Sequence, residues 1–161
     1  MLKRTVLRLA GAAALLALSA CATTPTPTTI ADTAALTPQL STLTRLLGEA
    51  GLADTLRGTG PFTVFAPSDE AFKALPAATM AQLAANKEML RGVLTFHVVP
   101  GKVMAADVKN GPAKTVQGAN VALSRAGTFV TVEDAVVQVA DVAATNGVVH
   151  IIDRVMIPPK P

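Results

Sequence analysis

Near the end of the chain, Val148 to Ile152 form an unbroken apolar, β-branched run around His150. Such a run predicts a strand that is covered on both faces, and the preceding pair Asn146-Gly147 predicts a tight type I′ turn with positive φ at both positions. We therefore expect the second strand of a hairpin. Because side chains alternate along a strand, His150 lies on a buried face and its ring needs a hydrogen-bond partner.

Helical signals occupy the first half of the chain. Thr37 is a predicted N-cap, followed by proline, by apolar residues at helical spacing and by Gly51 as the stop. Ser68 is a predicted cap of a second helix whose first turn is acidic, as the helix dipole favours. Further helices are predicted near Met80 and from Asn86, the last with its apolar residues on one side.

The pattern changes to short strands in the second half of the chain. The predicted runs are Val121 to Leu123, Phe129 to Val132, and Val136 to Ala140, separated by glycines and an acidic pair. An earlier strand at Phe62 to Phe65 must pair with strands from this half, which is a long-range pairing. Helices first and antiparallel strands afterwards predict one domain with a sheet-based core and helices gathered on one side.

Three segments in order resemble one known family. They are GPFTVFAPSDEAF (Gly60 to Phe72), TFHVVPG (Thr95 to Gly101) and TNGVVHIIDRVMIPP (Thr145 to Pro159). The first and last resemble the two sequence motifs of the fasciclin domain, a secreted adhesion module, and the separation also matches. In that family a Tyr-His pair linked to domain integrity and adhesion stands where this chain has Phe96-His97, so the tyrosine hydroxyl is missing here.

The resemblance implies a fold that is mainly β with α+β character: a wedge-shaped two-sheet β-sandwich with helices along one edge. The fasciclin domain would span residues 30–157, and the proline-rich residues 158–161 would form a C-terminal tail. The residues expected to form the structural motif are Phe65, Pro67, Ser68, His97, Asn146, Gly147, His150 and Asp153.

The charge distribution excludes a nucleic-acid-binding class. Half of the 161 residues are hydrophobic and 16% are charged, enough for one ordinary core. Lys3, Arg4 and Arg8 account for the whole formal net charge of +3, so the rest of the chain is neutral. A neutral body without Trp or Tyr lacks both the basic footprint and the stacking side chains of nucleic-acid binding. The missing Trp and Tyr also weaken a sugar-binding interpretation.

The N-terminal segment predicts export. Residues 1–20 combine three cations with an apolar stretch that is too short to span a bilayer, which is typical of a signal peptide. Leu18 to Cys21 resembles the lipobox of bacterial lipoproteins, in which the cysteine is acylated and anchors the protein to a membrane. The alternative is ordinary signal cleavage at small residues, which releases the protein. Residues 21–29, rich in Pro and Thr, would form a tether, and Ala22 resembles outer-membrane sorting, so a periplasm-facing position is expected.

No catalytic or metal site is predicted. His97 and His150 are the only histidines and both fall on apolar surfaces, where donation to backbone carbonyls is the usual role. A zinc site would need a third ligand, which only a carboxylate could supply. Ser68 lacks the glycine-flanked elbow of a hydrolase nucleophile, and no phosphate-binding loop is present. No cofactor is therefore expected.

Asn86, Lys87 and Glu88 are the candidate partner-binding residues. With the next two residues they resemble the Asn-Lys-Asp-Ile-Leu stretch that binds integrins in animal fasciclin proteins. The alternative is a simple capped helix start, with Asn86 as the cap and Glu88 in the first turn.

The expected function is non-catalytic adhesion or matrix interaction by a membrane-anchored lipoprotein, with an unidentified surface protein or matrix component as partner. The alternative, also implied by the resemblance, is carriage of an apolar small molecule such as a carotenoid in an apolar groove.

Overall fold

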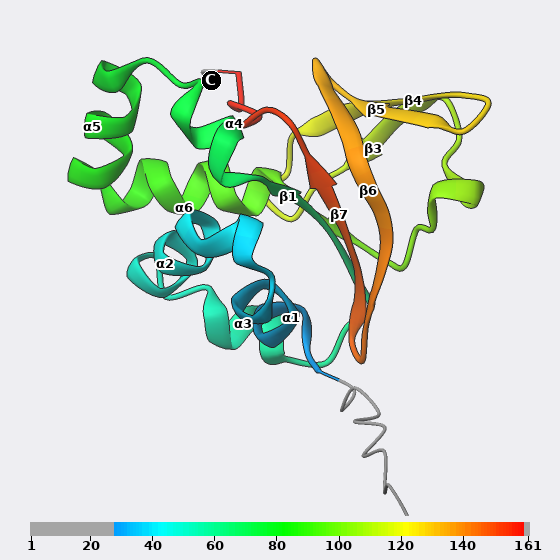
Figure 1. The fold of residues 1–161 in the computed structure, drawn as a ribbon, viewed down its shortest axis with the longest axis horizontal. Helices are drawn as coiled ribbons and strands as arrows, with labels where there is room; N and C mark the ends of the chain where they lie inside the picture. The colour runs from blue at the N-terminus through cyan, green and yellow to red at the C-terminus, as the bar shows by residue number, and fades with distance from the viewer. Residues whose placement is uncertain (1–27, 160–161) are drawn as a thin grey trace, which may run out of the picture.

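The computed structural model describes residues 28–159. The predicted signal peptide, Cys21 and most of the predicted tether lie outside the described residues. Helices precede most of the strands, as expected (Figure 1). The helices are α1 (Ile30–Leu36), α2 (Ser41–Glu49), α3 (Ala53–Arg57), α4 (Asp69–Lys73), α5 (Ala77–Ala85) and α6 (Lys87–Phe96), with 3₁₀ turns η1 (Pro38–Leu40) and η2 (Ala105–Asp107). The strands are β1 (Phe62–Pro67), β2 (Val98–Pro100), β3 (Gly111–Lys114), β4 (Asn120–Ala126), β5 (Phe129–Val132), β6 (Ala135–Ala144) and β7 (Gly147–Ile152).

The long-range strand pairing predicted from the sequence is confirmed. β1 lies between β2, which is antiparallel to it, and β7, which is parallel to it, so Phe62 pairs with Gly147 and Pro67 with Ile152. Every residue of β7 is buried, and β6 and β7 form the predicted hairpin. The apolar run is therefore the centre of the sheet.

The predicted arrangement of two separate sheets is not confirmed, because the strands form one seven-stranded sheet in the order β2-β1-β7-β6-β5-β4-β3. β6 connects the halves: its first residues pair with β5 and the rest pair with β7, with irregular register near Val137, Val139 and Val142. Alternating apolar residues predict individual strands. They do not show that one strand, here β6, pairs with both groups of strands and joins them into one sheet. The fold is mixed α/β rather than mainly β.

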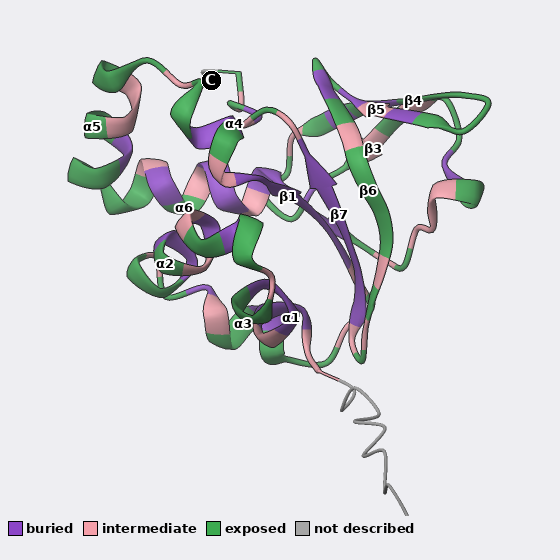
Figure 2. Cartoon of the chain, in the orientation of Figure 1, coloured by how far each residue is buried: buried purple, intermediate pink, exposed green. Residues whose placement is uncertain are grey.

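Two cores lie on the two faces of this sheet (Figure 2). On one face, the helices pack against β1 and β7 through Val64, Val149 and Ile151. The helices therefore cover a face of the sheet, whereas they were expected along one edge. On the other face, Phe65 and Ile152 pack against apolar residues of β4 and β5. The single sheet is thus folded so that its two halves enclose the second core.

Helix starts show which local predictions hold. Ser68 caps α4 by accepting a hydrogen bond from the Ala71 amide at 3.3 Å, as predicted. Thr37 holds the predicted N-cap position, with Pro38 as the first helical residue, but of a 3₁₀ turn that precedes α2. Its hydroxyl does not cap that turn and donates instead to the Thr33 carbonyl at 2.8 Å. The α2 start is bound instead by a distant carboxylate, because Asp69 accepts from the Thr42 amide at 2.8 Å.

Asp69 therefore belongs to two helices, lying in the first turn of α4 and at the start of α2. Its second carboxylate oxygen accepts from the Ser41 hydroxyl at 2.6 Å. Burial alone would raise the pKa of Asp69, but the hydrogen bonds from Ser41 and Thr42 outweigh it and lower the pKa. Helices α1 and α3 were not predicted, because their seven and five residues are too short for a clear apolar period.

Candidate functional site

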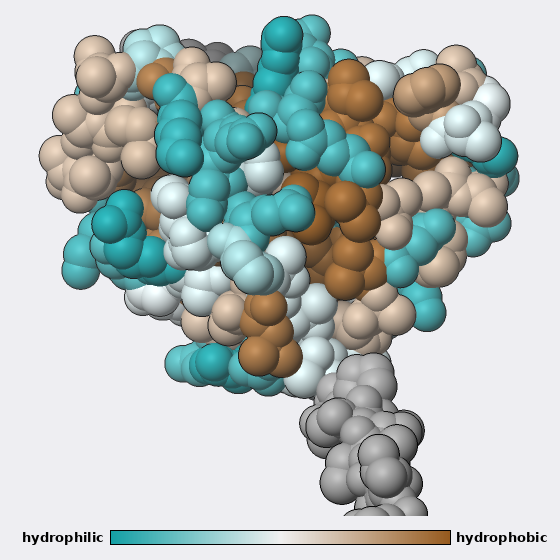
Figure 3. All heavy atoms as spheres, viewed as in Figure 1, coloured by the Kyte–Doolittle hydropathy of each residue, from teal (hydrophilic) through white to brown (hydrophobic). Residues whose placement is uncertain are grey.

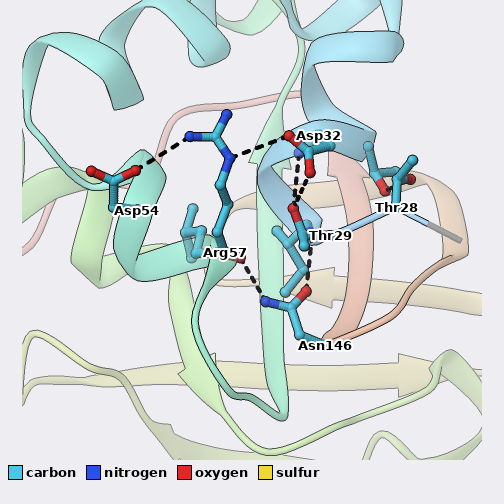
Figure 4. A network of polar contacts seen from close by, with 9 residues as sticks. Thr28, Thr29, Asp32, Asp54, Arg57 and Asn146 are labelled. Carbon is cyan, nitrogen blue, oxygen red and sulfur yellow. Dashed lines mark hydrogen bonds and ion pairs between the residues drawn. The ribbon is translucent and has the colours of Figure 1, made fainter.

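Asn146 joins four separate parts of the chain at one end of the molecule (Figure 4). Its side-chain oxygen accepts from the Ile30 amide at 2.9 Å, and its side-chain nitrogen donates to the carbonyls of Leu56 and Gly58 at 2.6 and 2.8 Å. Its backbone carbonyl accepts from the Phe62 amide at 3.0 Å. The amide group is thus fully used inside the fold and is not available to a ligand.

The predicted type I′ turn at Asn146-Gly147 is wrong, because Asn146 is not among the described residues with positive φ. Asn146 is explained by its side-chain hydrogen bonds and not by its backbone conformation. Gly147 is explained by space: a Cβ there would lie 1.9 Å from the Phe62 carbonyl oxygen and 2.8 Å from Ile30 Cδ1. The close approach of β1 and β7 therefore requires glycine.

The first described residues are fixed to this same end. The Thr28 carbonyl accepts from the Thr145 amide at 2.9 Å, and Thr29 caps α1. Asp32 accepts from the Thr29 hydroxyl at 2.6 Å and pairs with Arg57 at 3.3 Å. The hydrogen bond from Thr29, and then Arg57, hold the pKa of Asp32 below its ordinary value. The last two threonines of the predicted tether are therefore part of the folded body.

A hollow of about 500 Å³ lies beside Asn146, between the end of α3 and the β6–β7 turn. Its charged lining residues are Arg57 and Lys102. Arg57 pairs with Asp32 and Asp54, both at 3.3 Å, whereas no salt bridge among residues 28–159 involves Lys102. Sequence reasoning missed this hollow, because Arg57 and Lys102 belong to distant segments that no local pattern connects.

The two sequence motifs lie side by side, because β1 and β7 form a parallel pair from Phe62↔Gly147 to Pro67↔Ile152. Phe65 stacks on the His150 ring, with centroids 5.5 Å apart. Beyond the strands, the Ser68 amide donates to Ile152 at 3.0 Å, and Asp153 accepts from the Val136 amide at 2.7 Å. The motif residues thus hold β1 and β7 together at the centre of the sheet and bind the segments that follow these two strands.

Both histidines are buried and use both ring nitrogens. His150 Nδ1 accepts from the Asp141 amide at 3.2 Å, so its Nε2–H donates to the Val103 carbonyl at 2.8 Å. His97 has the opposite tautomer: Nε2 accepts from the Met156 amide at 3.0 Å and Nδ1–H donates to the Val93 carbonyl at 2.7 Å. Burial lowers the pKa of His97 to about 4. Neither ring has a nitrogen left for proton transfer or for a metal.

Asn86, Lys87 and Glu88 form the start of α6, beside the end of α5. The Asn86 side chain accepts from the Glu88 and Met89 amides, both at 3.0 Å, as an N-cap does. Lys87 and Glu88 are exposed. In Figure 1 this junction lies well away from the start of α1, where the described chain begins. The capped-helix interpretation explains Asn86, and the two charged side chains are free to meet a partner.

Apolar side chains are exposed along β6, where Val136 and Val139 are 38% and 41% accessible, and Figure 3 shows the apolar surface over this strand. Among the described residues, a purely apolar hollow between α3, β1 and β2 measures about 20 Å³, roughly the size of one water. No helix in residues 28–159 has the length and hydropathy to cross a membrane.

Comparison with known proteins agrees with the motifs and the fold. The family model of the fasciclin domain matches residues 38–158. Protein sll1483 of Synechocystis sp. is 44% identical over 140 residues, which are 86% of this chain and 78% of that protein. The cell surface glycolipoprotein MPB83 of Mycobacterium bovis is 38% identical over 81% of this chain and 60% of its own length.

A solved structure shows the same fold at low sequence identity. A fasciclin domain pair from the insect cell adhesion molecule Fasciclin I aligns with a TM-score of 0.64 and 17% identity, covering 81% of this chain and 51% of that one. Together with the family match over most of the body, this shows that the chain belongs to the fasciclin domain family.

Proposed function

We propose that this protein is a non-catalytic, lipid-anchored surface protein whose fasciclin domain binds a partner outside the cell membrane. The observation that carries the non-catalytic part is the state of His97 and His150, whose four ring nitrogens all bind backbone groups. Ser68, the other residue considered for catalysis, is buried and caps α4. The two histidines and Ser68 therefore serve the fold.

The anchor is supported by the sequence around Cys21 and by the relatives. Leu18 to Cys21 resembles a lipobox, and the mycobacterial relative is named a cell surface glycolipoprotein. Two or more acyl chains give stable attachment, whereas a single chain gives only marginal binding.

Adhesion is supported by the family and by the exposed charges that begin α6. Lys87 and Glu88 project from a helix start that is held by Asn86, so they are presented on a rigid element. Carriage of a carotenoid has weaker support, since a ligand of that size needs a pocket of several hundred Å³ with apolar walls. The purely apolar hollow of about 20 Å³ is far below that size. A hollow of about 500 Å³ beside Phe96 and Met156 is large enough, but Glu133, Asp134 and Arg154 are part of its wall.

Changing Cys21→Ser is expected to move the protein from the membrane fraction to the soluble fraction, because serine cannot be acylated as the lipobox cysteine is. Fractionation, with mass spectrometry of the mature N-terminus, measures this. Ser19→Ala is the matched control, since a small residue is retained there and anchoring should continue. A parent protein that is already soluble and begins at Thr23 would contradict the anchor.

Exchanging the charges at the α6 start, with Lys87→Glu and Glu88→Lys together, is expected to reduce attachment of protein-coated beads to cells or matrix. Stability should change by no more than about 0.5 kcal/mol, because both side chains are exposed. The matched control is Glu70→Lys with Lys73→Glu, an exposed pair on α4. Equal attachment by both double variants would show that the contact lies elsewhere, and a stoichiometric pigment in the native protein would favour carriage.

A further inference from the structure

The hollow beside Asn146 lies at the end of the molecule where the described chain begins. Thr28 is fixed to Thr145 in the β6–β7 turn, and that turn lines the hollow. In Figure 1 the start of α1 and the β6–β7 turn lie together at the bottom, whereas α4 and α5 lie at the top. The N-terminal segment therefore joins the domain at the same end as the hollow.

The chain between Cys21 and Thr28 is short. Six residues, 22–27, separate them. Seven steps between successive Cα atoms span at most about 25 Å when fully extended. If Cys21 is acylated, as the proposed function requires, the hollow cannot move far from the lipid surface. α4 and α5 are then displayed outward.

The lining of the hollow holds one cation, Lys102, that no carboxylate neutralises among the described residues. Its lining includes Arg57 and Lys102 and no Asp or Glu. Asp32 and Asp54 lie on α1 and α3, outside the lining, but both pair with Arg57 and offset its charge. Lys102 has no acidic partner among the described residues, so its charge is available to a phosphate.

We propose that this hollow rests against the phosphate headgroups of the membrane that carries the anchor, with Lys102 as the main contact and Arg57 in support. This orients the domain so that the α5–α6 junction, which carries Lys87 and Glu88, is not covered by the membrane. The inference depends on the proposed lipid anchor and adds the face that meets the bilayer.

The test uses the mature acylated protein in vesicles of phosphatidylglycerol and phosphatidylcholine. Because acylation occupies Cys21, an added cysteine is the only free thiol that can be labelled. Ala143→Cys on β6, beside the hollow, and Ala78→Cys on α5 are matched exposed positions. We expect energy transfer to a headgroup-labelled lipid to be much stronger from position 143 than from position 78.

Lys102→Gln should then shift the population away from the membrane-facing orientation by about fivefold, the effect of one lysine at an anionic surface. The matched control Lys73→Gln on α4 should have no effect. Equal transfer from positions 78 and 143, or transfer unchanged by Lys102→Gln, would overturn the inference while the anchor stands. A mature protein without acyl chains would overturn the proposed anchor, and the inference with it.

Discussion

Replacing Gly147 by alanine is expected to destabilise the domain by more than about 4 kcal/mol or to prevent folding, an exceptional effect for one methyl group. The new Cβ would lie 1.9 Å from the Phe62 carbonyl oxygen, which is backbone and cannot rotate away. It would also lie 2.8 Å from Ile30 Cδ1. Relief requires β1 and β7 to separate at the centre of the sheet, and chemical denaturation measures the loss.

Gly48→Ala is the matched control, because the same substitution should there have the opposite sign. Gly48 lies inside α2, and a Cβ added to it meets nothing within 4 Å. Alanine in a helix interior is favoured over glycine by up to about 1 kcal/mol. If Gly147→Ala were as stable as Gly48→Ala, the close pairing of β1 with β7 would be wrong.

The domain is expected to lose about 3 kcal/mol of stability on acidification because of His97. Burial lowers its pKa in the folded state from 6.5 to about 4. The unfolded chain therefore binds the proton more tightly, so this stability is fully present above pH 6.5 and is lost as the pH falls towards 4. Protonation also removes the Nε2 acceptor of the Met156 amide.

Unfolding free energies measured between pH 7 and pH 4 would test this, with His97→Gln as the control. Glutamine does not titrate, so the variant should start less stable but lack the steep decline, which for one proton is at most about 1.4 kcal/mol per pH unit. Parallel pH profiles for the two proteins would show that His97 binds its proton equally well in the folded and unfolded states, so that its pKa is not lowered by burial. The lowered pKa of Asp69 acts at lower pH, because its stabilisation is lost only below its ordinary value of 3.8.

Local chemistry explains which elements were predicted correctly. Asn86 and Ser68 act as helix caps because an N-cap needs only a side-chain acceptor within three residues of an amide donor. The buried strand β7 follows from its composition, since a short β-branched apolar run that begins after a glycine favours a strand covered on both faces. Thr37 has the same local signal as a cap, but its hydroxyl bonds back to Thr33 instead.

The candidate site was predicted only in part, because its residues come from segments that are far apart in the sequence. Asn146 was recognised as a turn residue, but its partners Ile30 and Leu56 are 116 and 90 residues away in sequence. The hollow with Arg57 and Lys102 has no sequence signal, because its walls come from α3, the segment after β2 and the β6–β7 turn. The charges of Lys87 and Glu88 were visible in the sequence, and the structure placed them at a helix start away from the start of α1.

The sequence by itself determined the family, the buried strand, the helix starts capped by Ser68 and Asn86, and the neutral charge of the body, because each depends on neighbouring residues or on composition. Only the tertiary structure decided that one sheet folds over two cores, that Asp69 binds the start of α2, and that Thr28 is fixed beside the β6–β7 turn. These features join segments far apart in the chain, and their free energy appears only when the chain has closed the long loops between them.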